Sequence, residues 1–103
     1  MREAVIVSTA RTPIGKAYRG SFNNTHAQTL AGHAISEAVK RAKVEPIDID
    51  DVILGAAAQQ GTQQGNIARQ SLLRAGLPTS VAGMSIDRQC ASGLMAIALL
   101  PNK

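Results

Sequence analysis

The chain has 103 residues, in which eleven Lys and Arg outnumber seven Asp and Glu and give a formal net charge of +4 at pH 7. This length excludes a complete two-domain enzyme, but it is compatible with one part of such an enzyme. Apolar residues make up 45% of the chain and charged residues only 17%. This balance excludes a disordered protein and is typical of a domain whose outer faces are covered.

The basic residues are spread along the whole sequence, and its aromatic residues are Tyr18 and Phe22. Proteins that bind nucleic acid usually gather their cations on one stripe and add aromatic side chains for stacking. We therefore expect no nucleic-acid partner, whereas a small polyanionic substrate is compatible with the charge. The basic cluster of Lys40, Arg41 and Lys43 is interpreted as the solvated end of a helix.

The single cysteine, Cys90, excludes an intramolecular disulfide framework and is typical of a reducing compartment. No apolar run approaches the roughly 18 residues that span a bilayer. The N-terminal stretch MREAVIVST lacks the layout of a signal peptide. The sequence therefore predicts a cytoplasmic protein with no membrane partner.

Residues 4–8 (AVIVS) form a short apolar run rich in β-branched side chains, which predicts a strand buried on both faces. Residues 11–22 contain Pro and Gly and predict an ordered loop. A helix is expected next, because Thr25 and Gln28 have capping-box spacing and apolar residues recur with helical period over residues 30–42.

Further along the chain, residues 52–54 predict a second buried strand. Asn66 is a suitable N-cap for a helix over residues 67–75, and Gly76 is a suitable stop. A third strand is expected at residues 81–86. The alternation of strands and helices predicts βαβ units, that is, an α/β fold with a mostly parallel sheet and helices on both faces.

The apolar run at residues 94–100 contains no polar side chain, so a helix formed here has no solvent face and should be buried on all sides. The strands and helices predicted before it cannot enclose such a helix. Pro101 then ends or interrupts it. We therefore expect the architecture to be incomplete within this chain.

The strongest chemical signal is the segment SIDRQCASGL at residues 85–94, in which a buried strand, a short turn and a helix follow one another around Cys90. Helix N-termini present unpaired N–H groups and a partial positive charge, which stabilise a thiolate and make it a better nucleophile. The same N–H groups can stabilise an oxyanion on an attacked carbonyl. Since Ser92 and Gly93 leave room for a substrate, the segment is similar to a nucleophile elbow that carries sulfur.

Two interpretations of Cys90 are compatible with the sequence: a catalytic nucleophile, or a small buried hydrophobic residue, since no base is evident beside it. The two histidines, His26 and His33, are the candidates for that base, and the simpler interpretation of each is a surface or packing residue. No metal site is expected, because ligand-type residues lack the required spacing. The glycine-containing stretch at residues 55–65 lacks the features of a phosphate loop and is interpreted as a structural turn.

Three blocks of the sequence, taken together with their order and spacing, are specific enough to compare with known families: AVIVSTARTPIGKAYRGSF at residues 4–22, LGAAAQQGTQQGNIARQ at residues 54–70, and DRQCASGLMAI at residues 87–97. Together they resemble the N-terminal part of the thiolases, a family that comprises acetyl-CoA acetyltransferases and 3-ketoacyl-CoA thiolases. The last block is similar to the family's nucleophile signature. Asp87 departs from the family, which more often has Asn there, and Pro101 stands where the family's helix continues.

The resemblance implies a thiolase-like βαβαβα portion of one half of a larger protein. In thiolases two similar halves pack face to face, with the helix after the nucleophile between their sheets. Residues 1–103 would then be the N-terminal part of the N-terminal domain, with the C-terminal domain absent. The family's acid/base groups, a second cysteine and two histidines, belong to that other half, and His26 and His33 do not occupy those motifs.

The resemblance also implies an acyltransferase of fatty acid metabolism. Cys90 would attack the keto carbon of a 3-ketoacyl-CoA, hold the acyl group as a thioester and pass it to a second CoA thiol, or run the reverse condensation of two acyl-CoA molecules. The backbone N–H of Cys90 would be one oxyanion donor. Coenzyme A would be a co-substrate, and neither a tightly bound cofactor nor a metal is expected.

Oligomerisation is a further implication, because thiolases pair around the strand that corresponds to residues 81–86. A homodimer or homotetramer is expected, since VAGMSI carries no charge to protect an open edge. Two alternatives stay open for the function. One is a condensing enzyme similar to ketoacyl synthases, against which the NIAR segment at residues 66–69 argues. The other is a non-catalytic fragment that acts as an assembly module.

Overall fold

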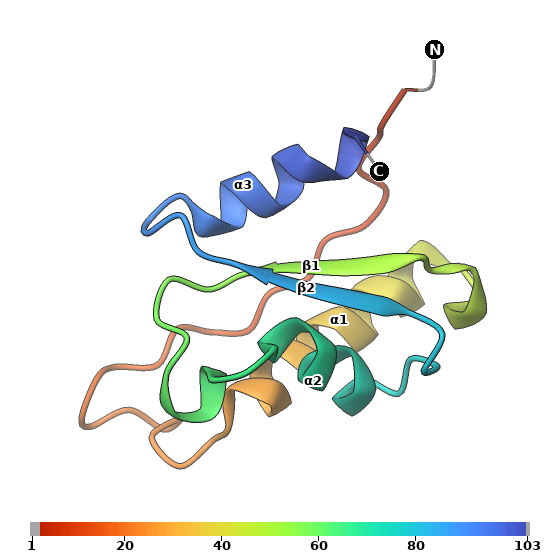
Figure 1. Cartoon of the computed structure of the whole chain (residues 1–103). Coiled ribbons are helices and arrows are strands. Elements are labelled where there is room, and N and C mark those ends of the chain that lie inside the picture. Colours follow the sequence, from red (N-terminus) through yellow and green to blue (C-terminus); the bar gives the residue numbers. More distant parts are fainter. Residues whose placement is uncertain (1–2, 103) are drawn as a thin grey trace.

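The computed structural model describes residues 3–102, which form three α-helices, a two-stranded sheet and short 3₁₀ turns (Figure 1). In chain order the helices and strands are α1 (Ala27–Ala42), β1 (Asp51–Gly55), α2 (Ile67–Arg74), β2 (Ala82–Ile86) and α3 (Ser92–Leu99). Between residues 3 and 102, no helix combines the length and the apolar character that crossing a bilayer requires.

The two strands pair in parallel, with Asp51 opposite Ala82 and Gly55 opposite Ile86. Helices α1 and α2 lie on one face of this sheet and α3 lies on the other (Figure 1). The predicted α/β fold with helices on both faces is therefore confirmed. The strands expected at residues 52–54 and 81–86 are confirmed as β1 and β2, and they form a parallel pair as the βαβ pattern predicts.

The strand predicted at residues 4–8 is wrong. This segment is irregular, and the side chains of residues 5–7 are each at least 70% exposed instead of buried. A run of β-branched residues becomes a strand only when another backbone lies in register beside it. In the described part of the chain the sheet order is β1–β2 alone, so no ladder includes this segment.

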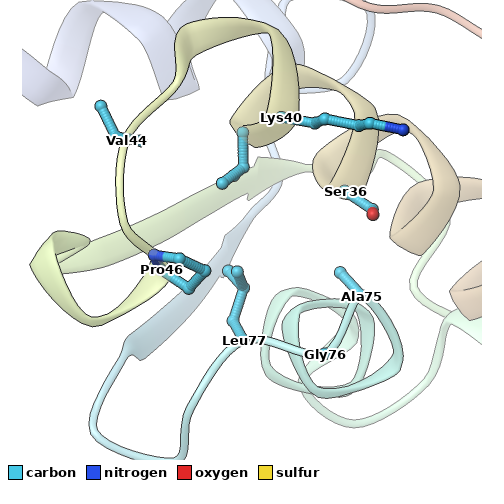
Figure 2. Close-up of a pocket in the computed structure, with 8 residues that line it drawn as sticks. Ser36, Lys40, Val44, Pro46, Ala75, Gly76 and Leu77 are labelled. Carbon is cyan, nitrogen blue, oxygen red and sulfur yellow. The ribbon is translucent and has the colours of Figure 1, made fainter.

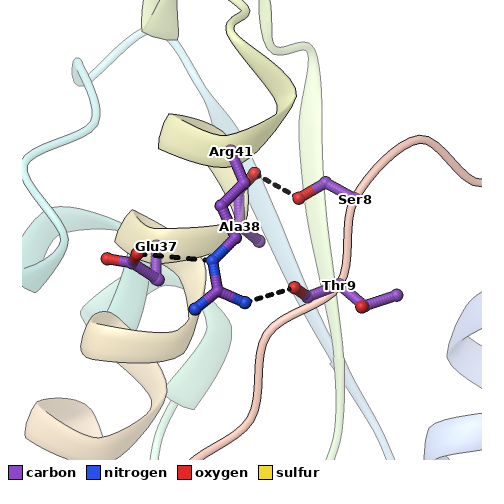
Figure 3. A network of polar contacts seen from close by, with 5 residues as sticks. All are labelled: Ser8, Thr9, Glu37, Ala38 and Arg41. Carbon is purple, nitrogen blue, oxygen red and sulfur yellow. Dashed lines mark hydrogen bonds and ion pairs between the residues drawn. The ribbon is translucent and has the colours of Figure 1, made fainter.

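Side chains fasten the N-terminal segment to α1 instead (Figure 3). The Ser8 hydroxyl donates to the Ala38 carbonyl over 2.7 Å, and the Arg41 guanidinium donates to the Thr9 carbonyl over 3.0 Å. Arg41 also pairs with Glu37, one helical turn earlier, at 3.3 Å. The interpretation of the basic cluster as a solvated helix end is confirmed, since the Arg41 side chain is 57% exposed in the last turn of α1. Arg41 in addition binds the N-terminal segment, which the sheet does not hold.

Helix α1 begins and is capped differently from the prediction. Its N-cap is His26, which makes no side-chain capping bond, and the capping box expected from Thr25 and Gln28 is not formed. The Gln28 amide donates instead to the Thr62 carbonyl and to the Gln70 side chain, at 2.7 and 2.6 Å. Gln28 therefore joins α1 to the α2 region, which is a long-range contact that local spacing does not reveal.

Helix α2 confirms its predicted cap and stop. The Asn66 carboxamide oxygen accepts from the Arg69 N–H at 3.2 Å, and its nitrogen donates to the Gly83 carbonyl at 2.9 Å. The Ser85 hydroxyl donates to the same Asn66 oxygen and accepts from the Ala68 N–H. The start of α2 is therefore tied to β2, the strand that leads to Cys90.

The hydrophobic core lies between the sheet and the two helices α1 and α2. Small and branched aliphatic side chains from these elements and from the segment before β2 fill it: Leu72, Leu77, Val81, Ile35, Val39, Ile49, Val52 and Ala75. Burial of this set against the sheet fixes the platform from which the β2–α3 connection emerges.

Helix α3 packs on the opposite face of the sheet with one side only. Ser92 and Ala96 are buried, whereas Leu94 is 72% exposed and Ile97 is 55% exposed. The expectation that the elements of this chain cannot enclose the helix is therefore confirmed for residues 3–102, because no layer of that part of the chain covers its outer side. The helix ends at Leu99, ahead of Pro101, as expected.

Candidate functional site

Cys90 lies in the connection between β2 and α3, two residues ahead of the first residue of the helix, and its side chain is exposed. The strand–turn–helix arrangement expected from the sequence is therefore present. The alternative interpretation, a small buried hydrophobic residue, is wrong for the described chain. A thiol in this place is open to a reactant and sits at the positive end of the α3 dipole.

The turn that carries Cys90 is closed by hydrogen bonds from its own residues. The Ser92 hydroxyl accepts from the Arg88 N–H at 2.8 Å and donates to the Gln89 carbonyl at 2.7 Å. The Asp87 carboxylate accepts from the Gln89 N–H at 2.8 Å. Gln89 adopts φ 53°, a left-handed conformation that is uncommon for a residue with a side chain. The side chains of Asp87 and Ser92 thus hold the backbone sharply turned at Gln89, immediately before Cys90.

Asp87 occupies the position at which the resemblance leads one to expect Asn. Its contact in the turn uses one side-chain oxygen as an acceptor. An Asn side chain also offers one acceptor oxygen in the same place. Asp at this position therefore makes the same kind of hydrogen bond that an Asn could make, and the turn does not require one of the two residues.

Gly55, the last residue of β1, lets the start of α3 approach the sheet closely. A Cβ atom added at Gly55 would lie 2.3 Å from the carbonyl carbon and oxygen of Ser92 and 2.5 Å from the nitrogen of Gly93. These distances are far shorter than any real Cβ contact, and the opposing atoms are backbone. Only glycine fits at this position, so the close approach of β1 fixes where α3 begins.

The site combines the exposed thiol of Cys90 with the backbone N–H groups at the start of α3. Backbone N–H groups at the start of a helix can donate to a developing oxyanion, and the N–H of Cys90 itself is the one nearest to the sulfur along the chain. Among residues 3–102, no three side chains of the His, Cys, Asp and Glu types lie close enough together to hold a metal ion. The arrangement can support covalent catalysis by the thiol, with proton transfer supplied by other groups.

The two histidines are not brought to Cys90. His26 precedes α1 and His33 lies within it, and both side chains are exposed. They line shallow surface cavities together with Arg74 of α2, whereas α3 lies across the sheet. The interpretation of both as surface residues is confirmed, and neither is placed to serve as the base for Cys90.

Cavities elsewhere in the chain carry no comparable chemistry. One of about 250 Å³ lies between α1 and the end of α2, with Lys40 at its edge (Figure 2). Another, of about 360 Å³, lies between the N-terminal segment and the end of α3, where Ile97 and Leu100 face residues 5–9. Cys90 lines neither of them.

Comparison with known proteins adds to this geometry. The sequence matches the family described as "Thiolase, N-terminal domain" over residues 4–103. The chain belongs to the thiolase family. It is 43% identical over 103 residues to a 3-ketoacyl-CoA thiolase of Bacillus subtilis (strain 168), covering 100% of this chain and 26% of that protein.

Two thiolase-family proteins of Escherichia coli (strain K12) are similar to a comparable degree. An acetyl-CoA acetyltransferase is 42% identical over 99 residues, which cover 96% of this chain and 25% of the relative. A 3-oxoadipyl-CoA/3-oxo-5,6-dehydrosuberyl-CoA thiolase is 46% identical over 98 residues, which cover 94% of this chain and 24% of the relative. The chain thus spans about a quarter of the length of these thiolases.

Sequence reasoning found Cys90 but missed the residues that hold it. The sequence draws attention to Ser92 only for its small size, and to Gly55 as the end of a strand and the start of a turn that lets the backbone pass close to a neighbour. A hydroxyl two residues after Cys90, close to the expected start of a helix, is the available signal for a capping contact. The sequence does not identify Ser92 as the neighbour that Gly55 approaches, since 37 positions separate them.

Proposed function

We propose that the protein to which this chain belongs is a coenzyme A-dependent acyltransferase that uses Cys90 as its nucleophile. It cleaves a 3-ketoacyl-CoA thiolytically or condenses two acyl-CoA molecules in the reverse direction. The observation that carries the proposal is the exposed thiol of Cys90, held in a hydrogen-bonded turn directly ahead of α3. Relatives named 3-ketoacyl-CoA thiolase and acetyl-CoA acetyltransferase support the reaction class.

The reaction consists of two transfers that balance at the Cys90 sulfur. In the first, the Cys90 thiol loses its proton to a base, the sulfur attacks the keto carbon and the Cα–Cβ bond breaks. The enolate carbon of the leaving acetyl-CoA takes up a proton and becomes its methyl group. In the second, the thiol of a free coenzyme A attacks the acyl-Cys90 thioester and releases a shortened acyl-CoA and the cysteine. Two covalent half-reactions imply ping-pong kinetics. The Cys90 N–H is a donor for the oxyanion of each step.

The proton transfers need groups outside the described site, because His26 and His33 lie in other parts of the structure. We therefore place residues 1–103 in the N-terminal part of the N-terminal domain, with the acid and base contributed by a separate domain. The relatives support this division, since the chain spans only about a quarter of their length. Coenzyme A takes part as a co-substrate and not as a resident cofactor.

A homo-oligomer through β2 is part of the proposal. The outer edge of this strand is partly occupied, because Asn66 donates to the Gly83 carbonyl and Arg69 donates to the Val81 carbonyl just before the strand. A partner strand on this edge would therefore pair with the backbone N–H groups of the edge and with the backbone of Ser85, rather than with the two occupied carbonyls. The dimeric or tetrameric state, a role in fatty acid metabolism and the cytoplasmic location stay predictions from the sequence.

The test is to identify the residue that carries the acyl group in the full-length protein. Incubation with acetyl-CoA should add one acetyl group, located at Cys90 by mass spectrometry, and Cys90→Ser should abolish both the adduct and the thiolysis of acetoacetyl-CoA. A label on another residue would overturn the assignment. An acylated Cys90 without release by free coenzyme A would favour the ketoacyl-synthase-like alternative, and no acylation at all would favour an assembly module.

A further inference from the structure

The Ser92 hydroxyl is a buried polar group with both of its hydrogen-bonding functions in use. Ser92 is 4% exposed, and its oxygen bridges two successive residues of the turn, accepting from the Arg88 N–H and donating to the Gln89 carbonyl. The two bonded residues come immediately before Cys90. A hydroxyl that serves as donor and acceptor at once holds two backbone groups in a fixed relation to each other.

The conformation that this bridge holds is not one that the backbone favours. Gln89 has φ 53°, in the left-handed region, where a side chain is disfavoured. Such a residue persists only where its surroundings determine it. The Asp87 carboxylate accepts from the Gln89 N–H, and the Gln89 carbonyl accepts from both the hydroxyl and the backbone N–H of Ser92.

Ser92 is in turn fixed from the sheet side. Its backbone carbonyl lies against Gly55 so closely that a Cβ atom there would be only 2.3 Å away. The last residue of β1 therefore sets the position of Ser92, and the Ser92 hydroxyl sets the position of the turn. Through these two contacts the sheet determines where the sulfur of Cys90 stands.

We propose that Ser92 is a positioning residue for the reaction at Cys90: its hydroxyl clamps the Arg88–Gln89 turn and thereby orients the thiol toward the attacked carbonyl. The proposal rests on the proposed function for its catalytic consequence. The clamp also has a consequence in the free protein that does not depend on catalysis: the Ser92 hydroxyl should protect the Arg88 N–H from hydrogen exchange.

The experiment uses the full-length protein with Ser92→Ala, and Ser71→Ala is the matched control. Ser71 is also fully buried in a helix, and among residues 3–102 its hydroxyl has no hydrogen-bond partner. Both variants lose one buried hydroxyl, but only Ser92→Ala loses the clamp. Three rates are measured: acetylation of Cys90 by acetyl-CoA, alkylation of Cys90 by iodoacetamide, and hydrogen exchange of the Arg88 amide.

In Ser92→Ala, acetylation should slow by about tenfold or more, since misplacement of a reacting group by about 1 Å can cost about a hundredfold. Alkylation by the small reagent, which needs no oriented attack on a bound substrate, should change less than about threefold. The Arg88 amide should exchange at least about tenfold faster, because it has lost its acceptor. The KM of Ser92→Ala for the acyl-CoA should stay near the wild-type value. All three rates of Ser71→Ala should also stay near those of the wild type.

Unchanged acetylation in Ser92→Ala would overturn the positioning role, and so would an equal loss of acetylation and alkylation, which would show that the thiol is merely less accessible. Unchanged exchange of the Arg88 amide would overturn the clamp itself. A wild-type protein that takes no acetyl group on Cys90 would refute the proposed function. In that case the exchange rate of Arg88 still decides whether Ser92 holds the turn.

Discussion

Substitution of Gly55 by alanine tests the contact through which the sheet positions the nucleophile. The added Cβ atom would lie 2.3 Å from the carbonyl of Ser92, whereas ordinary van der Waals contact begins at 3.4 Å. The start of α3 must therefore retreat from β1 by about 1 Å, as the difference between these distances shows. Because the opposing atoms are backbone, no side-chain rotation can relieve the overlap.

The expected loss of stability follows from two opposing effects. Overpacking at a well-packed contact costs about 1–3 kcal/mol. Replacement of Gly by Ala returns about 0.4–1 kcal/mol, because it restricts the unfolded chain. Gly55→Ala should therefore lower the free energy of unfolding by about 1–2 kcal/mol and, through the displacement of Cys90, slow its acetylation by about tenfold to a hundredfold.

Gly93→Ala is the matched control for stability, because it is the same chemical change at the neighbouring end of the same contact. A Cβ atom at Gly93 meets nothing within 4 Å, and the residue lies in the first turn of α3. This variant should be as stable as the wild type or gain about 0.5–1 kcal/mol, since Ala is the better helix former. Urea denaturation of the full-length variants measures both values. Equal stability of the two variants, with wild-type acetylation in Gly55→Ala, would refute the argument.

Three further predictions concern the surroundings of the site. Asn66→Ala should lower the free energy of unfolding by about 1–2 kcal/mol in urea denaturation, because α2 loses its N-cap and its link to β2. Arg69→Lys should lower it by about 1–3 kcal/mol, since one ammonium group cannot replace the guanidinium that binds both the Thr79 and Val81 carbonyls. Residues 1–103 expressed alone should associate in light scattering and show no enzymatic loss of acetoacetyl-CoA absorbance, whereas Leu94→Glu should reduce the association.

Each of these has a contrary outcome. The control for Asn66→Ala is Asn24→Ala, at an exposed position in a turn, which should change the free energy of unfolding by less than about 0.5 kcal/mol. If Asn66→Ala had an equally small effect, Asn66 would not stabilise α2 as its N-cap. A Lys variant of Arg69 as stable as the wild type would show that its two hydrogen bonds contribute no net stability. Turnover by a monodisperse monomer of residues 1–103 would show that these residues contain their own acid and base.

The parts of the fold that the sequence predicted correctly depend on neighbours in the chain. The Asn66 cap, the strands at residues 52–54 and 81–86 and the end of α3 before Pro101 each follow from a few adjacent residues. The predictions that were wrong concern residues whose structure depends on contacts with distant parts of the chain. Gln28 bonds to Thr62 and Gln70 instead of capping α1. Residues 4–8 have strand propensity, but in residues 3–102 no strand pairs with them.

The candidate site divides in the same way, and the division explains why its nucleophile was predictable and its base was not. The turn from Asp87 to Ser92 closes on itself through three side-chain and two backbone hydrogen bonds within six consecutive residues. One short stretch of sequence therefore contains most of what shapes it. Gly55 adds the single long-range contact, at which a backbone must come closer than any Cβ allows. A proton-transfer group faces no such local requirement and needs only to reach the sulfur in space, so no spacing in the sequence could assign it to His26 or His33. Under the proposed function, covalent chemistry by Cys90 would depend on residues 87–92 and Gly55 for position, and on groups other than His26 and His33 for protons.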